Sequence, residues 1–286
     1  MSNLKHIFVL LVLIAAGCNL TQEIDLDLPE AGGQPVVECY LEPGKPYRLL
    51  LTRSSAYFDD FPTEPEDFIE QILIDSAEVE IRHGSEVIAL DNEPDIDFEF
   101  SKLYNYSSTK LVPFDTLTEF ELFIVLPDGN SIEANTVILP VVPIDSVVIE
   151  FPDEEINPDS IPKARALTYL TDNPGQVNYY RRMFHWNSLD SIPEQDFVTN
   201  DDFVDNGTLV FGTGFDYPVG DTLYNTIFHI TQDYYDYQAS IFNSIAANAN
   251  PFAPPGLIES NVRGSSDPLG IFTGLSIYRD TSIVME

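Results

Sequence analysis

Carboxylates and amides gather in one short stretch of the second half of the chain. Within Asp196–Gly207 they are Asn200, Asp201, Asp202, Asp205 and Asn206. Calcium takes about six to eight oxygen ligands, often from a single loop. The EF-hand order is not met, however, because Phe203 and Val204 separate Asp202 from the next acidic residue. We therefore expect a solvated acidic loop, with a bound calcium ion as the alternative.

Cys18, at the end of an apolar run, is a second candidate for chemistry. Lys5 precedes the run Ile7–Ala16, and small residues lead directly into Cys18. The run is too short to span a bilayer, which takes about 20 apolar residues, but it suits a signal peptide. The pattern is that of a lipobox, in which the cysteine is diacylated, the chain is cut before it and the new amine is acylated. The alternative is an ordinary secretory cleavage site.

Lipidation of Cys18 would decide where the protein is found. We predict a signal peptide at 1–17, acyl chains on Cys18 and a flexible acidic tether at 18–34. Each buried CH₂ contributes about 0.8 kcal/mol, so more than one acyl chain anchors a protein stably in a bilayer. We therefore expect a lipid-anchored protein.

Aromatic and acidic side chains are concentrated in Ser54–Gln71, between two predicted hairpins. Its centre is Tyr57, Phe58, Asp59, Asp60 and Phe61. A loop of this length in a compact domain is functional or mobile. The aromatic rings could stack on sugars or contact a partner, and the alternative is that they belong to the hydrophobic core.

Catalytic signatures are scarce. The sequence contains no G-x-S-x-G elbow, Walker loop or Rossmann glycine pattern. His83, His185 and His229 do not have the spacing of a zinc site, and Cys39 lies in a strand-like run where cysteine is usually a small core residue. We expect no enzyme activity, no metal site and no cofactor beyond the lipid.

Short alternating segments with turns between them predict β-structure. The predicted hairpins of the first half are joined by turns at 42–46, 83–85 and 127–130. They indicate an immunoglobulin-like or transthyretin-like β-sandwich over 35–140, followed by a proline-bearing boundary. A second β-rich domain follows at 144–286. There, Tyr234, Tyr237, Ile241 and Ile245 recur at helical spacing and predict one helix near 232–248.

The charge is strongly acidic. The chain has 13 Lys and Arg against 47 Asp and Glu, a formal net charge of −34, and loss of residues 1–17 would remove Lys5 and bring it to −35. Such a surface repels nucleic acid and anionic headgroups. We therefore exclude nucleic acid as a partner.

Several segments together carry a family likeness: Glu23–Pro29, Val36–Glu38, Leu51–Asp59, Pro143–Val147, Asn178–Arg181, Asn250–Phe252, Ile258–Val262 and Gly270–Phe272. They resemble a family of Bacteroidota outer-membrane lipoproteins, domain of unknown function 4249. The resemblance implies an outer-membrane lipoprotein that is exposed on the cell surface and encoded beside a TonB-dependent receptor. It carries over no catalytic or binding residue. One departure is Arg263–Leu269, which is longer than the short glycine turn expected there.

Two functions remain open at this point. The first is a non-catalytic accessory of a TonB-dependent receptor that helps to capture or admit a ligand. The second is a stand-alone surface module or adhesin that binds glycan or peptide through Ser54–Gln71.

Overall fold

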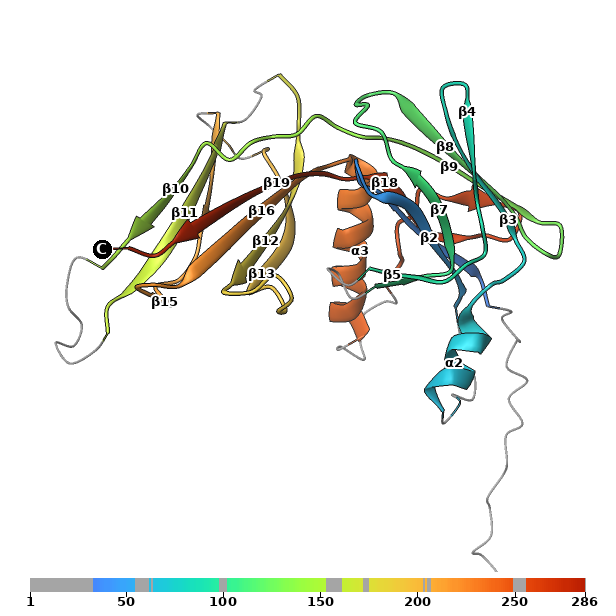
Figure 1. The fold of residues 1–286 in the computed structure, drawn as a ribbon, viewed down its shortest axis with the longest axis horizontal. Helices are drawn as coiled ribbons and strands as arrows, with labels where there is room; N and C mark the ends of the chain where they lie inside the picture. Colours follow the sequence, from blue (N-terminus) through green and yellow to red (C-terminus); the bar gives the residue numbers. More distant parts are fainter. Residues whose placement is uncertain are drawn as a thin grey trace, which may run out of the picture. The chain divides into compact units, whose positions relative to one another are not determined.

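β-Strands carry most of the computed structural model, which describes residues 33–54, 62, 64–97, 102–152, 161–171, 175–202, 204, 207–248 and 256–285. Within these ranges the chain forms strands throughout and the helices α2 and α3 (Figure 1). The prediction of a mainly β protein is confirmed. No helix in this part of the chain is long and apolar enough to cross a membrane.

The first pair of sheets encloses the larger core. One sheet has the strand order β18-β1-β2-β7 and the other β17-β9-β8-β3-β4. The first comprises β18 (Leu269–Gly274), β1 (Pro35–Leu41), β2 (Pro46–Arg53) and β7 (Tyr106–Leu111). The second comprises β17 (Arg263–Gly264), β9 (Ser131–Val137), β8 (Glu119–Val125), β3 (Glu78–His83) and β4 (Glu86–Leu90). Leu49, Phe120 and Phe272 are fully buried between them, so the two sheets form a sandwich.

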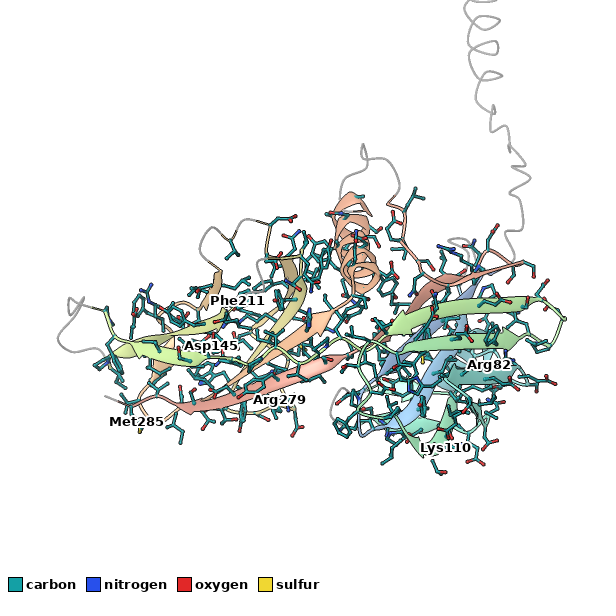
Figure 2. All side chains as sticks on the ribbon, turned by 90° about the horizontal axis from the view of Figure 1, so that it is seen from above. Arg82, Lys110, Asp145, Phe211, Arg279 and Met285 are labelled. Atoms are coloured by element: carbon teal, nitrogen blue, oxygen red, sulfur yellow. The ribbon has the colours of Figure 1, made fainter. Side chains whose placement is uncertain are left out.

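A second pair of sheets forms from the later strands. One has the order β10-β11-β14 with β15 also on β11, and the other β13-β12-β16-β19. The first comprises β10 (Ser146–Glu150), β11 (Lys163–Thr171), β14 (Thr208–Gly212) and β15 (Tyr217–Pro218). The second comprises β13 (Gln195–Asn200), β12 (Tyr179–Trp186), β16 (Thr222–Ile230) and β19 (Ser276–Ile283). Leu170, Tyr180 and Ile227 share the core between these sheets. The labelled Asp145, Phe211 and Arg279 lie on this second sandwich, and Arg82 and Lys110 lie on the first (Figure 2).

The first sandwich takes two strands from the far end of the chain. β18 pairs in parallel with β1, in register from Val36 with Leu269 to Leu41 with Gly274. Gly270 has φ +124°, and a Cβ there would lie 1.9 Å from the carbonyl oxygen of Val37, so the pairing requires glycine. Residues 33–286 form one compact unit. The boundary predicted between 140 and 144 stays a prediction.

The described residues include two helices, of which α3 contributes to the cleft described below. α3 (Gln232–Asn248) has the predicted bounds, and Thr231 Oγ1 accepts a hydrogen bond from the Tyr234 amide at 3.4 Å, as an N-cap does. α2 (Pro65–Ile72) overlaps Ser54–Gln71, the stretch that the sequence predicted as a loop. Its Pro65 suits the first turn of a helix, because the missing N–H is not needed there.

Several strands of the central layers are covered on both faces. On β12, Tyr180 faces the core of the second sandwich, whereas Met183 packs with Phe228 and Tyr234 in a separate cluster against α3. On β18, Phe272 joins the first sandwich and Ile271 joins this separate cluster. The cluster therefore connects the outer faces of two sheets through α3. Double covering explains why β16 and β18 are buried almost continuously rather than alternately.

Candidate binding cleft

A cavity of about 360 Å³, here called the cleft, is formed by strands of both sandwiches and by α3. One wall comes from β1, β2 and the small sheet of β5 (Asp95–Asp97) and β6 (Lys102–Tyr104). The other comes from β12, β13, β16 and α3. The volume lies at the lower end of the range of small-molecule sites, about 300–1,000 Å³. The cleft is large enough for a small organic ligand.

Arg181 is the best-anchored cation of the cleft. Its Nε and Nη2 donate to Oδ1 and Oδ2 of Asp196, each at 2.7 Å, and its Nη1 donates to the hydroxyl of Tyr234 at 2.6 Å. Burial lowers the pKa of Arg181, but the bonds to Asp196 and the neighbouring Tyr234 outweigh it and leave that pKa well above its usual value. The guanidinium is therefore charged and fixed in orientation, since a bidentate pair defines its plane.

Lys102 is held on the opposite wall. It forms an ion pair with Glu38, and its Nζ lies 4.3 Å from the ring centroid of Tyr40. The Tyr40 hydroxyl donates to Glu38 Oε2 at 3.2 Å. Burial, and then the charge of Glu38, raise the pKa of Tyr40. The phenol therefore stays protonated and acts as a hydrogen-bonding group rather than a base.

Arg48 fixes the small β5–β6 sheet against β2. Its Nε donates to Asp95 Oδ2 at 2.5 Å and its Nη1 to Asp97 Oδ2 at 2.8 Å. Asp97 is the register partner of Lys102, so the same two-stranded sheet carries a carboxylate and an ammonium into the cleft wall. These contacts hold β5 and β6 in place, because a two-stranded sheet is marginal alone.

The base of the cleft is apolar. Phe228 is 1 % exposed, and Met183 and Leu275 are each 7 % exposed, although all three line the cavity. Tyr40 and Tyr234 meet edge to face above the same cluster, with ring centroids 6.0 Å apart. The lining cations are more exposed, at 18 % to 25 % of their side chains for Arg48, Arg181 and Lys102. The cleft therefore has an apolar floor and a polar rim.

Positive charge is concentrated here relative to the rest of the chain. Four of the 13 Lys and Arg residues line the cleft: Lys45, Arg48, Lys102 and Arg181. Three acidic residues, Glu42, Asp97 and Asp196, line it with them. A chain with a net charge of −34 thus has a nearly neutral patch built of close ion pairs.

Of the residues that the sequence singled out as candidate sites, Asp196 lines the cleft. Cys18 and the group Tyr57, Phe58, Asp59, Asp60 and Phe61 lie outside the described residues. Their roles in lipidation and partner binding stay predictions.

The acidic stretch considered for calcium is used structurally where it is described. Asp196 and Asn200 belong to β13 rather than to a loop, and Asp196 faces Arg181. Asp201 is 8 % exposed and accepts bonds from the backbone N–H of Asn178 at 3.0 and 2.9 Å. Asn200 Nδ2 donates to Asp202 Oδ2 at 2.9 Å, while Asp205 and Asn206 lie outside the described residues. Across the described ranges, no three His, Cys, Asp or Glu side chains are grouped as metal ligands.

Cys39 and two of the histidines have structural surroundings. Cys39 is fully buried in the first core, as predicted, and burial raises its thiol pKa. His83 Nε2 lies 3.0 Å from Asp115 Oδ2 with its ring stacked on Phe120. His229 Nδ1 lies 2.7 Å from the Pro140 carbonyl oxygen, and burial lowers its pKa. Neither histidine lines the cleft.

Sequence reasoning missed the cleft because its residues are distant along the chain. One signal was available. On β12 and β13, Arg181 pairs with Val198 and Met183 with Asp196, so Arg181 and Asp196 are diagonal neighbours. Diagonal cross-strand pairs are within reach of long side chains, and recognising β13 as a strand would have placed this ion pair.

The fold and cleft define a mainly β protein with a small-molecule-sized cavity between sheets. The chain belongs to the family described as Domain of unknown function (DUF4249), whose model matches residues 21–281. No curated protein matches the chain.

Proposed function

We propose that this protein is a non-catalytic, surface-exposed outer-membrane lipoprotein that captures a small ligand and presents it to a TonB-dependent receptor. The observation that carries the capture step is the cleft, with its apolar floor and its rim of fixed ion pairs. The lipobox at Cys18 and the resemblance to outer-membrane lipoproteins support the anchor and the receptor.

The side chains of the cleft favour binding over catalysis. Its described lining contains no His, Cys or Ser, and the carboxylate of Asp196 is held by Arg181. Burial raises the pKa of Tyr234, Tyr40 and Tyr104 above their usual range. A general base works best with a pKa near the operating pH, and these groups lie far from it. They orient a ligand without exchanging protons with it.

The receptor half of the proposal is tested by purification. The full lipidated chain is isolated from outer membranes, and the co-purifying proteins are identified by mass spectrometry. We expect a TonB-dependent barrel in stoichiometric amount and a diacylated or triacylated Cys18 at the new N-terminus. Recovery of the lipoprotein alone would overturn the receptor partnership.

The capture half is tested by filling the cleft. Gln238 lines the cleft from α3, whereas Asn243 is exposed on the same helix and lies outside the lining. Ligand retention is read as the small molecules that co-purify with the full chain and are identified by mass spectrometry. Gln238→Trp should abolish this retention, and Asn243→Trp, the matched control, should leave it unchanged. Equal retention by both variants would overturn capture in the cleft.

The second candidate is a stand-alone module or adhesin for glycan or peptide. It would use the same cleft of about 360 Å³ and differs from the first candidate in needing no receptor. This candidate predicts ligand binding by the protein purified without any barrel. If its site is instead Ser54–Gln71, substitution of Tyr57, Phe58 and Phe61 should abolish binding without lowering the melting temperature.

A further inference from the structure

We propose that the ligand of the cleft is a neutral, hydroxyl-rich ring compound, that is, a mono- or disaccharide without acidic or amino groups. The inference rests on the proposed capture function and names the chemistry of the ligand. It follows from how the charges of the cleft are paired, from which hydrogen-bonding groups those pairs leave, and from the shape of the lining.

The first step is charge. Three lining cations already have carboxylate partners: Arg181 has Asp196, Arg48 has Asp95 and Asp97, and Lys102 has Glu38. A ligand carboxylate or phosphate bound to Arg181, Arg48 or Lys102 would have to displace one of these partners. It would also enter a protein with a net charge of −34, whose field repels anions. A ligand ammonium would likewise compete with a fixed guanidinium or ammonium for its carboxylate.

The second step is hydrogen bonding. Arg181 uses three N–H groups and Arg48 two on the bonds described above, and a guanidinium has more donors than these. Each oxygen of Asp196 accepts one bond from Arg181 and keeps further acceptor capacity. The rim therefore presents donors beside acceptors at fixed spacing. A hydroxyl group both donates and accepts, so a pair of adjacent ring hydroxyls can bridge a guanidinium and its carboxylate.

The third step concerns the apolar floor of the cleft. Met183, Phe228 and Leu275 present carbon to the cavity and are almost fully buried even without a ligand. A fully polar ligand would lose its hydration there without compensation. A sugar ring has a face of C–H groups and a belt of hydroxyls, so it matches an apolar floor and a polar rim together. The cavity of about 360 Å³ limits it to a short saccharide.

The test compares ligands that share a ring and differ in charge. The full chain is purified in a detergent without a sugar headgroup and titrated with glucose, galactose, mannose and their common disaccharides. The same titrations use the matching uronates and amino sugars, together with Ala-Ala and Gly-Phe as dipeptide probes. We expect a neutral saccharide to bind at least 10-fold more tightly than its uronate and its amino counterpart.

The outcomes separate this inference from the capture function. Tighter binding of a uronate, an amino sugar or a dipeptide would overturn the neutral-saccharide inference and leave capture standing. Binding of none of the probes would overturn the inference, and ligand retention lost in Gln238→Trp but kept in Asn243→Trp would still support capture. The saccharide inference and the capture function fail together only if no probe binds and the two Trp variants also show the same ligand retention.

Two substitutions in the cleft test whether the saccharide binds at its polar rim. Asp196→Asn keeps the shape and weakens the acceptor beside Arg181, so it should lower affinity at least 10-fold. Glu150→Gln is the matched control, because Arg165 donates to Glu150 at 2.9 and 2.7 Å on the second sandwich, outside the cleft lining. Gln238→Leu is a second cleft variant, at a site without a charge to unbalance folding. Unchanged affinity in both cleft variants would contradict saccharide binding at this rim.

Discussion

Arg181 and Arg182 are neighbours on β12 with opposite surroundings. Arg181 faces the cleft, with Asp196 and Tyr234 as partners and a raised pKa. Arg182 points into the second sandwich and is fully buried. Its Nη2 donates to Asn225 Oδ1 at 3.3 Å, while Nε and Nη1 have no acceptor among the residues that the structure describes. Burial lowers the pKa of Arg182 to about 10.

The two environments separate a charge at the rim of the cleft from a charge buried in the core. Arg182 lies 5.4 Å from the ring centroids of Phe184 and Phe211, which partly compensate its burial through cation–π contacts. It has no water-sized space beside it, since the side chain is 0 % exposed. A buried cation with unpaired donors destabilises the fold, whereas the paired Arg181, whose side chain is 22 % exposed, stabilises it. The comparison shows that the arginine at the rim of the cleft has partners for its charge, whereas the arginine in the second core lacks acceptors for two of its nitrogens.

The largest effect is expected from Arg181→Met. The variant leaves the Tyr234 hydroxyl without its partner in a side chain that is 0 % exposed, and leaves Asp196 unpaired. Such losses cost about 3 kcal/mol. Urea unfolding of the full chain in detergent measures it. A loss below 0.5 kcal/mol, in the size range of a surface pair, would remove the contrast with Arg182.

Arg182→Met, the same substitution at the next residue, should raise the free energy of unfolding instead of lowering it. Arg182→Met removes an unpaired buried charge and retains most of the buried volume. Asn225 Oδ1 keeps its bond from Thr168 Oγ1 at 2.7 Å, so no acceptor is left without a donor. We expect the free energy of unfolding to rise by about 1–2 kcal/mol. A marked fall in the urea midpoint would show that Arg182 has a stabilising partner.

A smaller effect is expected from Tyr234→Phe, which deletes only the hydroxyl that accepts from Arg181. The free energy of unfolding should fall by about 1 kcal/mol, the net value of one hydrogen bond. In the Arg181→Met background the same deletion should cost less, because the partner is already missing. Additivity of the two substitutions would mean that the bond contributes nothing to stability.

The smallest effect is expected at the exposed pair Arg165–Glu150. Both side chains are more than one third exposed, at 39 % and 38 %. Glu150→Gln should change the free energy of unfolding by less than about 0.5 kcal/mol, because solvent screens such pairs. A loss as large as that of Arg181→Met would show that burial is not what distinguishes the two arginine–carboxylate pairs.

Local patterns predicted the elements that depend on local physics. The spacing of Tyr234 and Tyr237 predicted the helix α3. Both rings are buried in the cluster that this helix covers. Val37 and Cys39 alternate with half-buried residues on β1 and face the first core. Alternation and helical period are visible in a short window of sequence.

The features that the sequence did not predict depend on contacts between residues far apart along the chain. Nothing near Gly270 predicts that β18 pairs with β1, more than 200 residues earlier along the chain. Asp196 looked like part of a polar loop because β13 is only half-buried along its length and lacks an alternating apolar pattern. Arg181 and Arg182 are indistinguishable as a dipeptide, and only the strands on either side decide which one is paired. The cleft depends on these long-range pairings, so it could not be predicted from spacing.

The central claim is that the cleft itself holds the ligand, and one titration series tests it most directly. The tightest-binding neutral saccharide is titrated calorimetrically into the full chain, Gln238→Trp and Asn243→Trp, each checked for an unchanged melting temperature. The account predicts that Asn243→Trp binds within 2-fold of the unsubstituted chain and that Gln238→Trp binds at least 10-fold more weakly. Equal affinity of all three proteins would contradict it.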